Sequence, residues 1–356
     1  MTAATLRRVR TAAALAIAAA SYAPATALAA PSPSTAPTTT APAATSVPTT
    51  PKPKPKPKPP PPPAVIATAS VRLAGLFTVH RASVTVPNRA VEVNGTVSQF
   101  VPGQRLTLRA FVNGRRFEST SLQLKRTGGR AGWFGAIVRA PGAGNVSVVV
   151  THQRNLLMRG FEARAGYQTL DEDVGYGSTG RFVQLIQQRL AALHFYIPQT
   201  GVFDAGTELA LDAYHRLLRW GYAQTVGPAT TTQLLNGAGA FRVRFPGQGE
   251  HAEGDLSDQL VALINGSAVR MIFPISSGKP STPTILGSYR VYLRTPGYLP
   301  DGMYYSDFFI GGYALHGYDP APDYPASHGC MRLPIVDAIT AYNWLKLGDW
   351  VDTYYT

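Results

Sequence analysis

The residues best suited to chemistry lie close together near the end of the chain. Residues 327–334 read SHGCMRLP and contain Cys330, the one cysteine among 356 residues. His328 precedes it by two positions, and a second histidine, His316, lies further upstream. A thiol is a good nucleophile only as the thiolate, so a catalytic cysteine needs a histidine within hydrogen-bond reach. This grouping predicts a cysteine nucleophile.

The two histidines are not equivalent partners for the thiol. In an extended segment, residues two apart lie on the same face about 6 to 7 Å apart, so His328 is not the better placed base. His316 can approach from a neighbouring strand, with its other ring nitrogen held by a carboxylate or a backbone carbonyl. Gly329 permits a tight turn that aims the amides of Gly329 and Cys330 at the oxygen of a tetrahedral intermediate. Each such donor is typically worth about 3 to 4 kcal/mol.

Three other roles for the cysteine stay open. Cys330 could be an inert buried thiol, which leaves the surrounding histidines and glycines unexplained. It could ligate zinc with His316 and His328, joined by Asp319 or Asp323, but this spacing matches none of the usual zinc motifs. It could also pair with a cysteine of another chain.

Strands and one late helix must position these residues. Pro334 and Gly348 bound the expected helix, with Ile335, Ile339, Tyr342 and Leu345 facing inward. Apolar and alternating runs predict the strands, which cover 241–247, 259–266, 268–276, 288–294 and 349–355. Residues 241–356 are therefore expected to form a mainly β catalytic domain.

In residues 166–240 the apolar residues recur at the spacing of a helix rather than at the spacing of a strand. Apolar residues recur at helical spacing in two stretches, with Ser178 and Asp204 as expected N-caps. A third short helix is expected to begin at Pro228. These patterns predict a small three-helix bundle.

Residues 64–165 read as short strands separated by glycine and proline turns. The dipeptide Asn113-Gly114 between two alternating runs is a strong hairpin signal. We expect an antiparallel β-sandwich, Ig-like in general shape, and hence a multidomain chain in which sandwich, helical bundle and mainly β domain follow one another.

This β-rich segment is also strongly basic. Residues 64–165 contain 14 Lys and Arg against 3 Asp and Glu, a net charge of +11, whereas residues 166–356 contain 12 against 17. A basic surface attracts polyanions, and for an exported protein the candidates are anionic wall polymers or anionic lipid rather than nucleic acid. A solvated basic surface without a dedicated partner is the alternative.

The first 63 residues predict export. Residues 1–29 are predicted to be an export signal. Three arginines precede an apolar run, and a cleavage site with small residues two positions apart follows it. The run is short for a membrane span of about 20 residues, although an uncleaved signal could still tether the chain. Residues 30–63 form a Pro/Lys-rich linker of polyproline II type. We expect an exported protein of the cell wall or periplasmic space, either secreted or membrane-tethered.

Two stretches carry a resemblance to known families. The run HGYDPAPDYPASHGCMRL resembles the catalytic signature of L,D-transpeptidases, and FPISSGKPSTPTILGSYRVYLR is similar to an upstream stretch of that family. The similarity spans 244–354. This sequence departs from the family pattern at Ile285-Leu286, which stand between Thr284 and Gly287 where the family usually has no intervening residues. Residues 174–237 resemble the three-helix peptidoglycan-binding-like domain of wall enzymes.

The resemblance implies roles for nine residues. The catalytic set consists of Cys330 as nucleophile, His316 as base, the Gly317 carbonyl that orients it, the Gly329 and Cys330 amides as oxyanion hole, Ser327 beside the nucleophile, and His328 shaping the pocket. Arg332, Tyr304 and Tyr305 are the implied substrate-binding residues.

The implied reaction is acyl transfer between peptidoglycan stem peptides. The cysteine attacks the L,D bond before the terminal D-alanine of a tetrapeptide stem, D-alanine leaves, and an amine of a neighbouring stem resolves the thioester into a 3→3 cross-link. The resemblance implies that no cofactor is needed and that carbapenems acylate the thiol. Two alternatives remain, an L,D-carboxypeptidase that uses the same site and a non-catalytic wall-binding protein.

Overall fold

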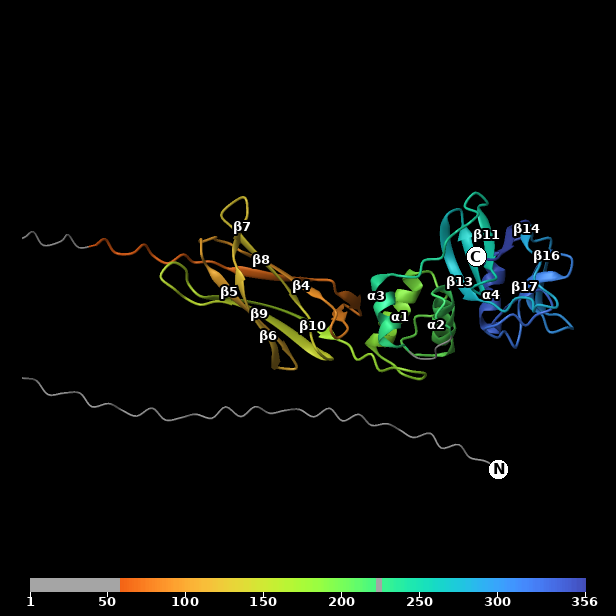
Figure 1. Cartoon of the computed structure of the whole chain (residues 1–356), viewed down its shortest axis with the longest axis horizontal. Helices are drawn as coiled ribbons and strands as arrows, with labels where there is room; N and C mark the ends of the chain where they lie inside the picture. The colour runs from red at the N-terminus through yellow and green to blue at the C-terminus, as the bar shows by residue number, and fades with distance from the viewer. Residues whose placement is uncertain (1–57, 222–225) are drawn as a thin grey trace, which may run out of the picture. The chain divides into compact units, whose positions relative to one another are not determined.

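The computed structural model describes residues 58–221 and 226–356 (Figure 1). The predicted export signal and most of the predicted linker lie outside these residues, while 58–63 are exposed and without regular structure. Residues 60–356 make up one compact unit. No helix in the described part is long and apolar enough to cross a membrane. The described part is mainly β with four helices, which agrees with the mainly β class predicted for residues 241–356.

Two sheets contain the strands of the basic segment. A four-stranded sheet has the order β1-β4-β8-β7, and a six-stranded sheet has the order β2-β3-β10-β9-β5-β6. The strands are β1 (Ala69–Ala74), β2 (Phe77–Val79), β3 (Ala82–Thr85), β4 (Val91–Val97), β5 (Arg105–Val112), β6 (Arg115–Gln123), β7 (Lys125–Arg126), β8 (Gly132–Val138), β9 (Gly144–His152) and β10 (Phe161–Thr169).

Both sheets contribute to one hydrophobic core. Val93 and Phe134 of the smaller sheet belong to the same buried cluster as Leu108 and Val148 of the larger one. The hairpin at 113–114 is confirmed: it joins β5 to β6, and both of its turn residues have the positive φ (48° and 79°) that a type I′ turn needs. The likeness to an Ig domain stays a prediction.

Three helices follow, α1 (Arg181–Ala192), α2 (Ala205–Leu217) and α3 (Pro228–Asn236). The N-cap prediction is confirmed at Asp204, whose Oδ1 accepts the amide hydrogen of Thr207 at 3.0 Å. It is wrong at Ser178, because α1 begins after Gly180 and the Ser178 hydroxyl instead accepts the amide hydrogen of Gly175 at 3.0 Å. The hydroxyl thus closes a turn before the helix rather than its first turn.

The last part contains two more sheets and one helix. Their orders are β13-β12-β11-β19-β14 and β15-β16-β17-β18. The elements are β11 (Glu250–Asp255), β12 (Leu260–Asn265), β13 (Ala268–Pro274), β14 (Gly287–Arg290), β15 (Leu293–Tyr298), β16 (Tyr304–Ile310), β17 (Tyr313–Gly317), β18 (Met331–Leu333), α4 (Ile335–Trp344) and β19 (Trp350–Tyr354).

Two expectations for this part are wrong. Residues 241–247 form no strand, and the first strand is β11, which the sequence pattern had not indicated. In α4 the alanines Ala338 and Ala341 are buried, whereas Ile339 is 39% exposed. A Cβ on Gly317 would lie 2.6 Å from the Cβ of Ala338, so the helix approaches β17 through small residues.

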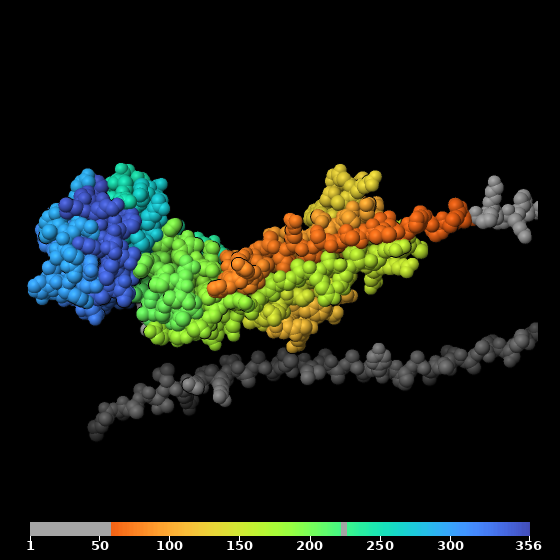
Figure 2. Space-filling view, turned by 180° about the vertical axis from the view of Figure 1, so that it is seen from behind, coloured from red at the N-terminus to blue at the C-terminus, as the bar shows by residue number. Residues whose placement is uncertain are grey.

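The three helices pack against this last part. Buried residues of α1, α2 and α3 share a cluster with Leu260, Ala262 and Ile264 of β12 and Ile272 of β13. In the space-filling view the surface of the helical segment continues directly into that of the last part (Figure 2).

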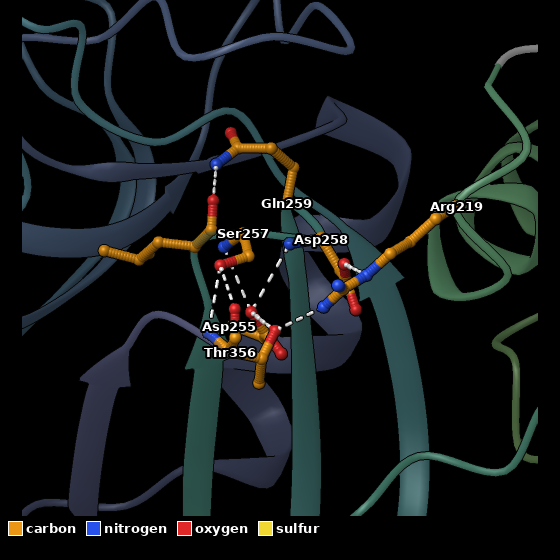
Figure 3. A network of polar contacts seen from close by, with 7 residues as sticks. Arg219, Asp255, Ser257, Asp258, Gln259 and Thr356 are labelled. Atoms are coloured by element: carbon orange, nitrogen blue, oxygen red, sulfur yellow. Dashed lines mark hydrogen bonds and ion pairs between the residues drawn. The ribbon is translucent and has the colours of Figure 1, made fainter.

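Two arginines at the end of α2 add polar contacts to this interface. Arg216, with a side chain only 9% exposed, donates to the carbonyl oxygens of Gln259 and Ile275 at 3.1 and 2.8 Å. Arg219 pairs with Asp258 at 3.0 Å and donates to the hydroxyl of Thr356 at 2.8 Å (Figure 3). These contacts fix α2 against the last sheets.

Candidate active site

Adjacent parallel strands bring the two histidine-containing stretches together. Strand β17 carries His316, and its neighbour β18 begins directly after Cys330, with His316 in register with Arg332. The thiol Sγ of Cys330 contacts the carbonyl oxygen of Gly312 at 3.4 Å. Within the described residues no hydrogen bond joins the thiol to the imidazole. Catalytic contacts are often long in free enzymes and shorten with substrate, so this does not remove His316 as a base.

The tautomer of His316 follows from its contact with the backbone. The ring is 2% exposed, and Nδ1 lies 2.9 Å from the carbonyl oxygen of Gly317. A carbonyl can only accept, so Nδ1 carries the hydrogen and Nε2 keeps a free lone pair. Burial lowers the pKa of His316 to about 4, the Arg332 guanidinium lowers it as well, and the Gly317 contact opposes both. The imidazole is therefore neutral at neutral pH.

The thiol is also neutral in the resting state. Burial raises the pKa of Cys330 above its ordinary value, and the Ala314 backbone and the Arg332 guanidinium, which favour the thiolate, do not offset it. The site therefore holds a neutral thiol and a neutral imidazole rather than a preformed ion pair. Such a pair reacts when the base removes the proton during attack.

A tight turn presents the cysteine. Ser327 is 1% exposed, and its hydroxyl donates to the Cys330 carbonyl at 2.6 Å and accepts from the Gly329 amide at 2.9 Å. Gly329 has a φ of 124°, and a Cβ there would lie 2.3 Å from Cε1 of Tyr313. Both facts require glycine. In this arrangement the Gly329 amide is engaged by Ser327, so it can serve an oxyanion only by exchanging that partner for the substrate oxygen.

The loop after β13 holds this turn in place. Ser276 and Arg332 exchange two backbone hydrogen bonds of 2.9 Å, and the carbonyl of Ser277 accepts the amide hydrogen of Ser327 at 3.0 Å. Gly278 permits the loop's own sharp turn, because a Cβ there would lie 2.3 Å from the carbonyl oxygen of Thr282. This explains physically why the stretch FPISSGKPSTPT accompanies the cysteine motif.

His328 contacts a lysine rather than the thiol. It is exposed, and its Nε2 lies 3.2 Å from the Nζ of Lys279. An ammonium only donates, so Nε2 of His328 accepts in this contact. Sequence reasoning assigned no role to Lys279, although the lysine lies within the upstream stretch that carries the family resemblance.

Tyr318 connects two of the predicted site residues. Its ring meets that of His316 edge to face, with centroids 5.8 Å apart, and the guanidinium carbon of Arg332 lies 4.0 Å from its ring centroid. The sequence signal for Tyr318 was its position two residues after His316, which places both on one face of an extended segment. Sequence reasoning missed it.

The two predicted substrate tyrosines have different surroundings. Tyr304 pairs with Gly317 across the sheet, and its ring centroid is 4.3 Å from that of Tyr298. Tyr305 has a φ of 51° and packs edge to face on Tyr342 of α4, at 5.0 Å. Tyr304 therefore lies beside the histidine strand, while Tyr305 contacts the helix.

The zinc arrangement considered from the sequence is not formed. Across residues 58–221 and 226–356, no three His, Cys, Asp or Glu side chains are grouped so that they could hold a metal ion. His328 contacts an ammonium, and His316 carries its hydrogen on Nδ1 toward a carbonyl. The donor set therefore does not converge on one point.

Comparison with known proteins relates the last part of the chain to one family. Residues 250–352 match the YkuD family model, described as the L,D-transpeptidase catalytic domain. Similar solved structures include L,D-transpeptidases from Xylanimonas cellulosilytica (29% identity over 52% of this chain and 98% of that one, TM-score 0.47) and Stackebrandtia nassauensis (20%, 52% and 97%, TM-score 0.34). A third is the catalytic domain of the Enterococcus faecium enzyme acylated by ertapenem (24%, 30% and 98%, TM-score 0.26). No curated protein matches the chain. Residues 250–352 of this chain are thus similar to the catalytic domain of L,D-transpeptidases.

Proposed function

We propose that this protein is a cysteine-dependent L,D-transpeptidase that forms 3→3 cross-links between peptidoglycan stem peptides. The observation that supports it best is the Nδ1 contact of His316 with the Gly317 carbonyl, which leaves Nε2 free as a base one strand away from Cys330. The family match over 250–352 is consistent with this chemistry.

The first half-reaction is acylation of the cysteine. Nε2 of His316 takes the thiol proton while Sγ of Cys330 attacks the carbonyl carbon before the terminal D-alanine. The intermediate's oxyanion is held by the Cys330 amide and by the Gly329 amide once it leaves Ser327. The C–N bond then breaks, the imidazolium returns its proton to the departing amine, and D-alanine leaves behind a thioester.

The second half-reaction transfers the acyl group. A neutral amine of a neighbouring stem attacks the thioester carbonyl, and His316 takes a proton from that nitrogen. The C–S bond breaks, and the proton passes to Sγ of Cys330, which restores the neutral thiol. If water attacks instead, the same steps yield a tripeptide and the enzyme is an L,D-carboxypeptidase.

Arg332 and Tyr304 are suited to substrate binding. Arg332 is in register with His316 across β17 and β18, and its charge lowers the pKa of both His316 and Cys330. A guanidinium there can bind a peptide carboxylate in two-point fashion. Tyr304, on the strand beside Gly317, offers an aromatic wall.

The remaining segments fit a protein of the bacterial wall. The expected signal and proline-rich linker imply export, and the basic strands of 64–165 suit anionic wall polymers by charge. We propose that the helical segment and the β segment place the catalytic domain near its substrate.

The test is incubation of the protein with disaccharide-tetrapeptide, followed by mass spectrometry. The expected product is a dimer that lacks one D-alanine, formed by the wild type and absent with Cys330→Ala. A carbapenem should add its mass to the wild type and leave Cys330→Ala unmodified. Cross-linking by Cys330→Ala would refute the mechanism, tripeptide alone would indicate hydrolysis, and no D-alanine release with intact wall binding would indicate a non-catalytic role.

A further inference from the structure

A cavity of about 710 Å³ lies between α2 and the catalytic domain. One wall comes from α2, including Glu208 and Asp212, and the other from Tyr298, Tyr318 and Asp319. A second cavity of about 420 Å³ shares Asp212 with it, so the two form one groove along the helix. The contacts of Arg216 and Arg219 described above fix α2 here, so the groove is a built feature of the fold.

The groove carries an excess of negative charge. Its lining includes the carboxylates of Glu208, Asp212, Asp319 and Asp323, and one cation, Arg216, which is already paired with Asp212 at 2.5 Å. The rest of the lining is apolar or aromatic. This combination suits a cationic group on an aliphatic chain.

One carboxylate oxygen in the groove lacks a hydrogen-bond partner. Asp212 is 4% exposed; its Oδ2 pairs with Arg216, while its buried Oδ1 has no hydrogen-bond partner. Buried polar atoms are rarely left unpaired, and a carboxylate oxygen can only accept. A ligand that supplies N–H donors would therefore complete this group.

One aromatic ring, that of Tyr318, lies between the groove and His316. Tyr318 lines the groove, and the same ring touches His316 edge to face and supports Arg332. A substrate whose scissile carbonyl sits between Cys330 and His316 can therefore send a side chain past Tyr318 toward Glu208.

We propose that this groove binds the side-chain ammonium of the donor stem's diamino acid, so that α2 contributes to donor selection by the catalytic domain. The proposal rests on the L,D-transpeptidase function proposed above. Carboxylates stabilise the protonated amine, which has no lone pair for attack. The groove therefore suits the donor, whose amine does not react, rather than the acceptor, whose amine must be neutral.

The test compares two tetrapeptide donors, one with a free side-chain amine and one with that amine acetylated. With enzyme in excess over donor, the rate of Cys330 acylation is read by intact mass. The variants are Glu208→Gln and Asp319→Asn, and the matched control is Glu118→Gln, which removes the same charge from β6 outside the groove. Acylation by a carbapenem reports whether the reacting groups remain intact.

We expect the wild type and Glu118→Gln to prefer the free amine by roughly tenfold, and each groove variant to lose about three- to tenfold of that preference. Carbapenem acylation should be equal in all four proteins. Equal rates with both donors, or an unchanged preference in Glu208→Gln and Asp319→Asn, would overturn the inference, as would an effect confined to the acceptor's KM. A wild type that reacts with neither donor nor carbapenem would refute the proposed function itself.

Discussion

Replacing Gly329 by alanine tests how the turn presents the nucleophile. At a φ of 124° a residue with a Cβ is strained by about 1–3 kcal/mol. The new Cβ would also lie 2.3 Å from the Tyr313 ring, so the ring or the turn must move by about 1 Å, at about 1–3 kcal/mol. Together these terms predict a loss of about 2–6 kcal/mol, or roughly 5–20 °C in the thermal midpoint.

The assay is thermal unfolding by circular dichroism, with Gly312→Ala as the matched control. Gly312 has open space around its Cα, so its alanine variant should unfold within about 2 °C of the wild type. Adding Tyr313→Ala to Gly329→Ala removes the clash but not the strain. The double variant should therefore lose less stability than the sum of the losses of the two single variants. If Gly329→Ala unfolds at the wild-type temperature, the argument for an obligatory glycine fails.

Three further predictions concern charge. Burial raises the pKa of Asp337 to about 7, so its carboxylate costs stability as pH rises from about 4 through 7. Asp337→Asn should therefore raise the thermal midpoint at pH 8, by an amount worth about 1–3 kcal/mol, and leave it nearly unchanged at pH 4, below the range in which the penalty develops. Arg216→Met leaves buried Asp212 unpaired and should cost about 3–5 kcal/mol in denaturant unfolding, whereas Arg219→Met, with a side chain 63% exposed, should cost at most about 1 kcal/mol. Because its pKa is raised, Cys330 should be alkylated by iodoacetamide at pH 7 more slowly than free cysteine, with a rate that still rises above pH 9; a rate equal to free cysteine would contradict the neutral resting thiol.

Local signals accounted for much of the secondary structure. The Asn113-Gly114 turn and the Asp204 cap need only a few neighbouring residues, and both are confirmed. The turn depends on the backbone conformations that Asn and Gly favour, and the cap depends on one hydrogen bond between residues three positions apart. Both can therefore be read from the local sequence.

Strand β11 shows why other elements escaped prediction. Its residues read EHAEGD, yet His251 and Glu253 are fully buried and lie 3.2 Å apart, and the Tyr354 hydroxyl donates to Glu253 at 2.8 Å. Burial of such polar residues depends on partners from distant strands. A hydrophobic pattern cannot reveal this. The sequence therefore predicted the first strand of this part at 241–247 instead of at β11.

The sequence alone determined the reactive set. One cysteine, two histidines and the glycines between them are covalent facts, and the chemistry of thiols and imidazoles limits what they can do. Only the tertiary structure decided how they act. The pairing of β17 with β18 puts His316 on the strand next to Cys330, burial favours the neutral forms of the thiol and the imidazole, and α2 supplies a carboxylate wall from a segment outside the family match. Desolvation and strand pairing depend on residues distant in the chain, so no local pattern encodes them.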